Sequence, residues 1–515
     1  MKPTQESVKP QPVPLSSRLE DNLARLQHSE QTRSDIVLRL IHDSITGSKE
    51  FALVYIEGLV DIASINESLV RPLMSAMSGF EESTEERFTE IRNCAAATGP
   101  SEIIEDIDAL WQQIMQGNTV ILAEGFNRAI SAGTSGGEYR SLTEPTTQNV
   151  IRGPKEAFTE NLRTNTSLIS RRLKSPKLRV EDKVIGVQTQ TNVSVVYLEG
   201  IAEASVVKEI HKRLDHIDID AILESGYIEE LIEDAALSPF PTIFNTERPD
   251  VATAGLLDGR VAIIVDGTPF VLLAPITFFS FFQSSEDYYQ RFYIASFWRM
   301  LRFGAFFVSL LLPSLYIAIT TYHPEMLPTT LLISLVAQRE GVPFPALIEA
   351  FMMEITFEIL REAGVRMPKA IGAAISIVGA LVLGQAAVEA GLISAAMVII
   401  VSFTAISNFV LPSTNLSVTV GLIRFLLMLL AGGLGLYGIM VGLMVLCIHL
   451  ASLRSFGVPY LMPLAPLVWK NLKDVFIRLP LWKMRTRPAG VTGPNRIREG
   501  KDQKPAPPKV KSRKE

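Results

Sequence analysis

Three carboxylates lie in an otherwise apolar stretch of the chain, residues 343–361 (PFPALIEAFMMEITFEILR). Apolar residues recur there at four-residue steps, which predicts a helix. Glu354 and Glu358 share another face of this helix, and Glu349 lies near its start. A fourth charge, Arg424, lies inside a later apolar run. A charge facing lipid is costly, so all four side chains must face protein, water or the membrane interface. They are our candidates for a polar path or pore.

Two arrangements of residues 343–361 stay open. In one, which we favour, the helix crosses a membrane and its acidic stripe lines a polar path. In the other it lies flat at the interface as an amphipathic helix. The partner of Arg424 is also open, since either Glu389 or a carboxylate of 343–361 would serve. The apolar piece before Pro343 is too short to span, and we expect a re-entrant or broken segment there.

The second half of the chain is dominated by apolar residues, and a bilayer core needs roughly 20 of them per span. Five candidate spans would place the two ends of the region on opposite sides. Arg299 and Arg302 beside the first span, together with the basic C-terminal segment, favour one cytoplasmic side for both ends. An even number is therefore expected: residues 343–361 would supply a sixth crossing, and four crossings remain if that helix lies flat. The five candidates are 298–320, 371–388, 391–411, 416–434 and 436–453.

The first half of the chain contains an internal repeat with an offset of 142 residues. LVYIEG at 53–58 matches VVYLEG at 195–200, and TVILAEG at 119–125 matches VAIIVDG at 261–267. Each apolar run of the first pair is followed by a helical pattern, which is typical of strand-then-helix units. The strands lack alternation, as expected when helices cover both faces of a sheet. We predict two related α/β lobes, whose crevice is either a ligand site or only part of a scaffold.

The residues that commonly carry catalysis or bind metal form no convincing set. The chain has 6 His and 2 Cys, without metal-ligand spacing, and no phosphate-binding or nucleophile motif in a suitable context. Glu57 and Glu199 each precede a Gly at a strand end, which is ordinary turn chemistry. We therefore expect no catalytic residues, no metal, no cofactor and no enzyme activity.

A cationic stretch lies between the two repeats. Arg163, Arg171 and Arg172 fall on a predicted helix, and Arg152 precedes it in an Arg-Gly-Pro sequence. One interpretation is a solvated helix face. The other is contact with lipid headgroups or with an acidic neighbouring subunit.

The two ends of the chain differ in charge and composition. The N-terminal residues lack an apolar signal-peptide core, so we expect the lobes to stay cytoplasmic. Residues 469–515 hold 14 Lys and Arg against 4 acids, a net charge of +10. Beside a membrane span such a segment favours anionic lipid, and without interleaved aromatic residues it does not indicate nucleic-acid binding. We expect a disordered leader with a first helix, two α/β subdomains, a helical membrane domain of four to six spans and a basic cytoplasmic tail, at residues 1–33, 34–180, 181–292, 293–456 and 457–515.

Long blocks of the sequence resemble the A subunits of GerA-type spore germinant receptors. They include TERPDVATAGLLDGRVAIIVDGTPFVLLAP at 246–275, SSEDYYQRF at 284–292 and IRGPKEAFTENLRTNTSLISRRLK at 151–174. The resemblance continues through 312–368 and 371–401 and covers about 34–460. Lys155, Ala157 and Ser170 depart from the family pattern and leave the role of their loop open.

The resemblance implies a two-lobed, internally repeated α/β soluble domain followed by an α-helical polytopic membrane domain, in the inner membrane of the endospore. It implies a homo-oligomer, with a cation pathway, that triggers germination in response to nutrients. The implied partners are a transporter-like B subunit that binds the germinant, a lipoprotein C subunit and membrane lipid. Two alternatives remain: a related accessory membrane protein of the dipicolinate-release machinery, or a scaffolding subunit without its own pore.

Overall fold

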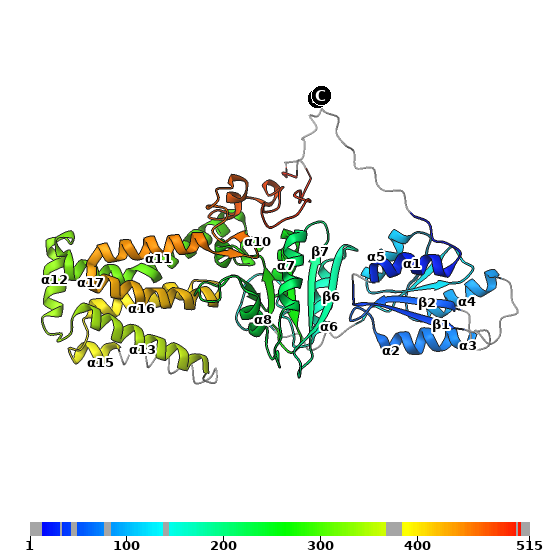
Figure 1. The fold of residues 1–515 in the computed structure, drawn as a ribbon, viewed down its shortest axis with the longest axis horizontal. Coiled ribbons are helices and arrows are strands. Elements are labelled where there is room, and N and C mark those ends of the chain that lie inside the picture. Colours follow the sequence, from blue (N-terminus) through cyan, green and yellow to red (C-terminus); the bar gives the residue numbers. More distant parts are fainter. Residues whose placement is uncertain are drawn as a thin grey trace, which may run out of the picture.

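The protein consists of three parts in a row, two α/β lobes and a helical bundle, with the C-terminal segment lying over the second lobe (Figure 1). The computed structural model describes residues 13–30, 33–42, 49–76, 84–136, 144–366, 384–500 and 503–505. Charged residues are frequent in the lobes and rare in the bundle, so the boundary seen in the composition is also a boundary in space.

The first lobe is a five-stranded antiparallel sheet covered by helices on both faces. Its strand order is β1-β2-β4-β5-β3. Alternate residues of β2 and β4 point to opposite faces, so Leu53 and Ile121 pack under one helical layer and Val54 and Val120 under the other. The strands are β1 (Ile36–His42), β2 (Lys49–Ile56), β3 (Ser101–Ile104), β4 (Thr119–Ala123) and β5 (Ala129–Ala132). The helices are α1 (Leu19–Glu30) and α5 (Ile107–Met115) on one face, and α2 (Ile62–Ser64), the π-helix η1 (Ile65–Val70), α3 (Arg71–Ala76) and α4 (Thr84–Ala96) toward the other.

The second lobe repeats this plan with the order β6-β7-β9-β10-β8. Its strands are β6 (Leu178–Ile185), β7 (Thr191–Leu198), β8 (Phe244–Thr246), β9 (Val261–Val265) and β10 (Val271–Ala274). Helices α7 (Ala204–Asp215) and α8 (Ser225–Ile232) cover one face, and α6 (Leu162–Arg172) and α9 (Pro249–Asp258) cover the other.

The internal repeat is confirmed down to the register of the strands. Leu53 pairs with Ile121 in the first sheet, and Val195 pairs with Ile263 in the second, each residue shifted by 142 positions. The two sheets are therefore copies of one unit, with equivalent residues in equivalent places.

The repeat also moves the lobe boundaries. Helix α1, which we had placed in the leader, packs on the first sheet through Leu19, Leu23 and Leu26. Helix α6, which we had placed in the first subdomain, packs on the second sheet through Leu168 and Ile169. The boundary at residue 180 therefore separates α6 from the sheet that it covers, and the second lobe begins before Leu162. Apolar helix faces alone do not say which of two similar sheets they will cover.

The strand-end acids serve this packing. Glu124 accepts a hydrogen bond from the backbone N–H of Leu19 at 2.7 Å, and Asp266 accepts one from Leu162 at 3.0 Å. Both donors are the first residues of their helices, whose N–H groups lack partners within the helix. The Glu-Gly and Asp-Gly ends thus have a structural role, binding helix starts at equivalent places in the two lobes.

The helical part follows a short linker that contains the 3₁₀ helix η3 (Phe278–Phe282) and α10 (Glu286–Tyr289). Its elements are α11 (Phe292–Tyr322), η4 (Pro324–Met326), α12 (Thr329–Arg339), α13 (Ala346–Arg366), α15 (Gly384–Glu389), α16 (Ala395–Phe409) and α17 (Thr414–Ser452). Among the described residues, α11 and α17 are long and apolar enough to cross a membrane, judged by length and composition. The candidate span 371–388 falls mostly outside the described residues, so it stays a prediction. Helix α12 buries none of its side chains in this chain and lies at the end of the bundle remote from the lobes (Figure 1).

Helix α17 is two antiparallel arms. As one straight helix its 39 residues would measure about 58 Å. However, Thr419 hydrogen-bonds the carbonyl of Pro239, while His449, 30 residues later, bonds the hydroxyl of Ser238. Both ends therefore reach one place on the second lobe, and the chain must reverse between them. It reverses at Gly435, whose φ of 61° and ψ of −143° leave the helical region, and the expected runs 416–434 and 436–453 meet at this residue.

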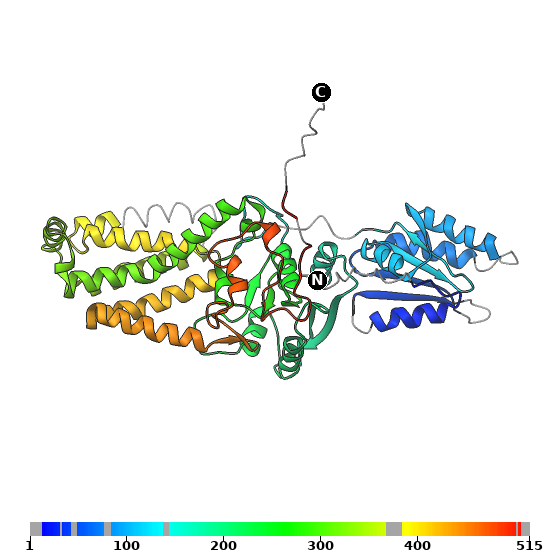
Figure 2. The same ribbon diagram turned by 90° about the horizontal axis from the view of Figure 1, so that it is seen from above.

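The C-terminal segment folds back onto the second lobe (Figure 2). The hydroxyl of Thr492 donates to the carbonyl of Asp258, and the N–H of Gly493 donates to Ile201 at 2.8 Å. The segment that we had expected as a tail is thus, as far as residue 500, part of the folded second lobe. Its short elements are β11 (Arg454–Ser455), β12 (Val458–Pro459), η6 (Trp469–Asp474) and η7 (Leu481–Lys483).

Candidate functional site

Glu354 of α13 and Arg424 of α17 form an ion pair inside the helical bundle. A guanidinium nitrogen lies 2.8 Å from a carboxylate oxygen, and the two side chains are 1% and 0% exposed. Of the two partners left open for Arg424, the carboxylate of the acidic helix is the one it meets. A second guanidinium nitrogen donates to the carbonyl of Ser309 on α11 at 3.3 Å. Three helices therefore share this one arginine.

Glu358, one turn further along α13, joins the same cluster. It lies 3.5 Å from Arg424 and 2.6 Å from Arg361, and its side chain is 23% exposed. Two carboxylates thus face two guanidinium groups, so the cluster is balanced in charge. This balance matters because a buried charge without a partner is strongly destabilising.

Glu349 lies apart from that cluster. Its side chain is fully buried and accepts hydrogen bonds from the backbone N–H of Ser394, at 2.6 Å, and from the Ser394 hydroxyl. Ser394 is the N-cap of α16, so the carboxylate holds the start of that helix. Arg339 lies 4.0 Å away. The structure thus brings three of the four candidate path residues together and assigns Glu349 a separate place.

Helix α13 lies alongside α16 rather than across the end of the bundle (Figures 1 and 2). Ala350 is fully buried in one apolar cluster with residues of α11, α16 and α17. Its 21 residues measure about 31 Å, close to the thickness of a bilayer core. Of the two arrangements considered for 343–361, this packing favours the crossing helix.

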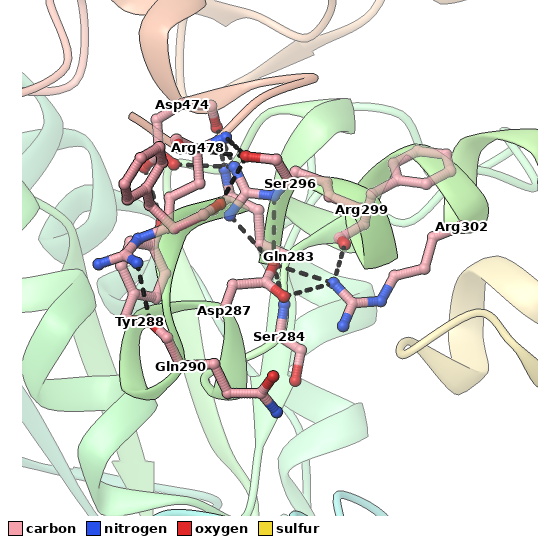
Figure 3. A network of polar contacts seen from close by, with 12 residues as sticks. Gln283, Ser284, Asp287, Tyr288, Gln290, Ser296, Arg299, Arg302, Asp474 and Arg478 are labelled. Carbon is pink, nitrogen blue, oxygen red and sulfur yellow. Dashed lines mark hydrogen bonds and ion pairs between the residues drawn. The ribbon is translucent and has the colours of Figure 1, made fainter. Parts of the chain in front are cut away.

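A second buried network holds the start of α11 (Figure 3). Asp287, 2% exposed, receives Arg299 at 3.0 Å and Arg302 at 2.8 Å. Arg299 also reaches Asp474 of the C-terminal segment at 2.8 Å. The arginines that we had interpreted as flanking charges are therefore anchors, which tie α11 to α10 and to the folded-back C-terminus.

Tyr288 and Arg478 extend this network. The hydroxyl of Tyr288 donates to Asp474 at 2.7 Å, and a guanidinium nitrogen of Arg478 donates to the carbonyl of Gln290 at 3.1 Å. Burial, with the neighbouring Asp474 carboxylate, raises the pKa of Tyr288 well above its ordinary value, so it stays a hydrogen-bond donor. We did not select Asp287 or Asp474 from the sequence. An acid just before a span that begins with three arginines was the available signal.

The cationic stretch is engaged mainly within the chain. Arg163 joins the lobes, lying 3.4 Å from Glu57 of the first and 2.8 Å from Asp182 of the second. Arg171 donates to the carbonyl of Gly58 at 3.3 Å, and Arg172 pairs with Glu156 at 2.5 Å. Arg152 is exposed. Its contact with a lipid headgroup or another subunit stays a prediction.

Other polar groups fit structural roles. Glu199 pairs with Arg179 beside the turn that it precedes. Within the part of the chain that the structure describes, no group of three or more His, Cys, Asp or Glu could hold a metal ion. The cavity considered next to the second lobe below does not lie between the lobes.

These features define the class of protein: a twofold-repeated α/β domain carried on an apolar helical domain with two helices able to span a membrane and with charge pairs in its interior. The family model described as "Bacillus/Clostridium GerA spore germination protein" matches residues 24–490. The chain therefore belongs to the GerA family of spore germination proteins, and the resemblance seen in the sequence is confirmed.

Individual relatives agree with this assignment. Spore germination protein KA of Bacillus subtilis (strain 168) is 48% identical over 501 residues, which cover 97% of this chain and 91% of the relative. Spore germination protein GerLA of Bacillus cereus is 40% identical, covering 92% of this chain and 96% of the relative. The chain is also similar to a crystal structure of the N-terminal domain of the A subunit of the Bacillus megaterium spore germinant receptor GerK3. That match has 39% identity and a TM-score of 0.42, over 52% of this chain and 98% of that one. These relatives support a role in spore germination.

Proposed function

We propose that this chain is the A-type membrane subunit of a spore germinant receptor, and that copies of it assemble into a ligand-gated cation channel that triggers germination in response to nutrients. It acts in the inner membrane of the endospore with a transporter-like B subunit and a lipoprotein C subunit. The observation that carries the proposal, beside family membership, is the Glu354–Arg424–Glu358 cluster inside an apolar bundle. Ionisable groups at such a depth are costly, and in membrane proteins they mark ion pathways.

The proposed topology is polytopic, with both ends of the helical region on the cytoplasmic side. Its support is that the start of α11 and the segment after α17 meet at Asp474, through Arg299. An even number of crossings follows if both lie on one side of the bilayer. Single-cysteine labelling at Arg496, in a background lacking Cys94 and Cys447, tests this. Labelling of intact protoplasts by an impermeant maleimide would contradict the topology.

Conductance tests the channel itself. The purified chain, with its two partner subunits, is reconstituted into planar bilayers and challenged with nutrient mixtures. Glu358→Gln changes a partly exposed member of the cluster and should alter cation conductance or selectivity. Glu362→Gln, an exposed carboxylate of the same helix that pairs with Arg366, is the matched control. Absence of nutrient-dependent current from the complete receptor would refute the channel.

One observation favours a second candidate, a scaffolding subunit without its own pore. The cluster is balanced in charge within a single chain, as a purely structural ion pair would be. A related accessory protein of the dipicolinate-release machinery would fit the same observation. In either case Glu358→Gln would change stability and leave any current of the assembled receptor unaltered.

A further inference from the structure

A cavity of about 470 Å³ lies where the second lobe, the start of the bundle and the C-terminal segment meet. Its walls come from the loop at 147–150, from α9, from η3 and α10, from the α16–α17 turn at 409–413, and from Arg498. This volume falls in the range of small-molecule sites. Tyr288 and Ser284 belong both to this wall and to the network of Figure 3, so the cavity lies beside the anchor of α11.

Two of the three arginines in the wall have carboxylate partners. Arg248 lies 2.8 Å from Asp250, and Arg498 pairs with Asp258. Arg260 has no carboxylate within ion-pair distance among the described residues. One of its terminal nitrogens donates to the Ser280 hydroxyl at 3.1 Å, and its buried Nε has no hydrogen-bond partner.

Arg260 is therefore a poorly satisfied cation. Burial lowers its pKa, although an arginine stays protonated in proteins. A buried cation without a paired anion is costly, and an anion entering the cavity would relieve that cost. The wall carries three cations against two carboxylates, so its residual charge matches a single negative group.

The rest of the wall is suited to an apolar body. Phe244, Phe281 and Val251 line it, with the Tyr289 ring held in place by a hydrogen bond to Asp250 at 2.5 Å. Aromatic and aliphatic walls around a few fixed polar groups are the usual composition of a small-molecule site.

We propose that this cavity binds a small organic monoanion, with its anionic group on Arg260 and Ser280 and a flat apolar part against the aromatic wall. Ser413 in the same wall is the N-cap of α17, so the ligand would contact the second lobe and the helical bundle together. The inference concerns binding to this chain alone and does not depend on whether the assembled receptor conducts ions.

Binding of benzoate to the purified full-length chain in detergent tests the proposal. Benzamide supplies the ring without the charge, acetate the charge without the ring, and inorganic phosphate stands for free phosphate or a headgroup. Isothermal titration should give the tightest dissociation constant for benzoate, in the millimolar range expected of so small a ligand. Arg260→Gln should weaken it at least about tenfold. Arg454→Gln, an exposed arginine outside the cavity, should leave it unchanged.

A second variant keeps the test decisive if Arg260→Gln does not fold. Ala254 on α9 lines the cavity with an exposed side chain, so Ala254→Leu fills space and improves the helix. It should abolish benzoate binding while Arg260 stays in place. Equal binding of benzamide and benzoate, tighter binding of phosphate or acetate, no benzoate binding, or unchanged binding by both variants would each overturn the proposal.

Discussion

Arg424 of α17 and Glu354 of α13 lie 2.8 Å apart, and at most 1% of either side chain is exposed. The pair joins helices whose positions in the sequence differ by 70 residues. Apolar side chains surround it, so neither charge has water as an alternative partner. The stability of the bundle should therefore depend on both members being present.

Removing the cation should be strongly destabilising. Arg424→Met leaves two carboxylates facing each other without their shared partner, and we expect a loss of about 3–5 kcal/mol in the free energy of unfolding. Unfolding of the full chain in detergent micelles measures it. Combining Arg424→Met with Glu354→Gln should recover a large part of the loss. A single variant within about 0.5 kcal/mol of the parent would contradict the pairing.

The reversal of α17 depends on a glycine at one position. A Cβ at Gly435 would combine a φ of 61° with a contact of 3.0 Å to the Cβ of Tyr322. Gly435→Ala should therefore cost about 1–3 kcal/mol of stability. Gly433→Ala is the control, because a Cβ there meets nothing within 4 Å and the residue is helical. It should be neutral or stabilising by up to about 1 kcal/mol. Equal losses would argue against a reversal at 435.

One carboxyl group should make the second lobe sensitive to pH. Burial, and then the charges of Glu233 and Glu224, raise the pKa of Glu229 on α8 to about 7. Its folded pKa exceeds the unfolded one, so the stability it contributes is present below the ordinary value of 4.5 and is lost as pH rises through about 7.

Glu229→Gln should therefore raise stability at pH 8, by on the order of 1–2 kcal/mol after allowing for its partial exposure, with little effect near pH 4.5. Thermal unfolding at the two pH values measures the difference. Glu230→Gln, on the exposed face of the same helix, should show a much smaller dependence. Equal stabilisation by Glu229→Gln at both pH values would contradict the assignment.

The repeat predicts matched effects in the two lobes. Glu124→Ala and Asp266→Ala each remove the acceptor for the first N–H of a helix, Leu19 of α1 and Leu162 of α6. Each should cost about 1 kcal/mol, and the two costs should add because the sites are far apart. Glu199→Ala, at an exposed surface pair, should change little. A cost from only one of the two variants would show that the lobes do not use their acids alike.

The sequence by itself determined the twofold α/β repeat, because strands that are buried on both faces must keep apolar residues at every position. It also determined that Glu349, Glu354 and Arg424 need shelter from lipid, since that follows from charge alone.

Tertiary structure alone decided the partners. Arg424 could reach Glu389 or Glu354 as far as sequence allows, and only the packing of α13 against α17 selects Glu354. Likewise, the apolar face of α6 suits either sheet, and the hydrophobic pattern runs unbroken through the glycines at 432–438 until Tyr322 meets Gly435. Local patterns record which side chains must be buried, whereas the choice among chemically equivalent burial sites depends on contacts between residues far apart in the chain.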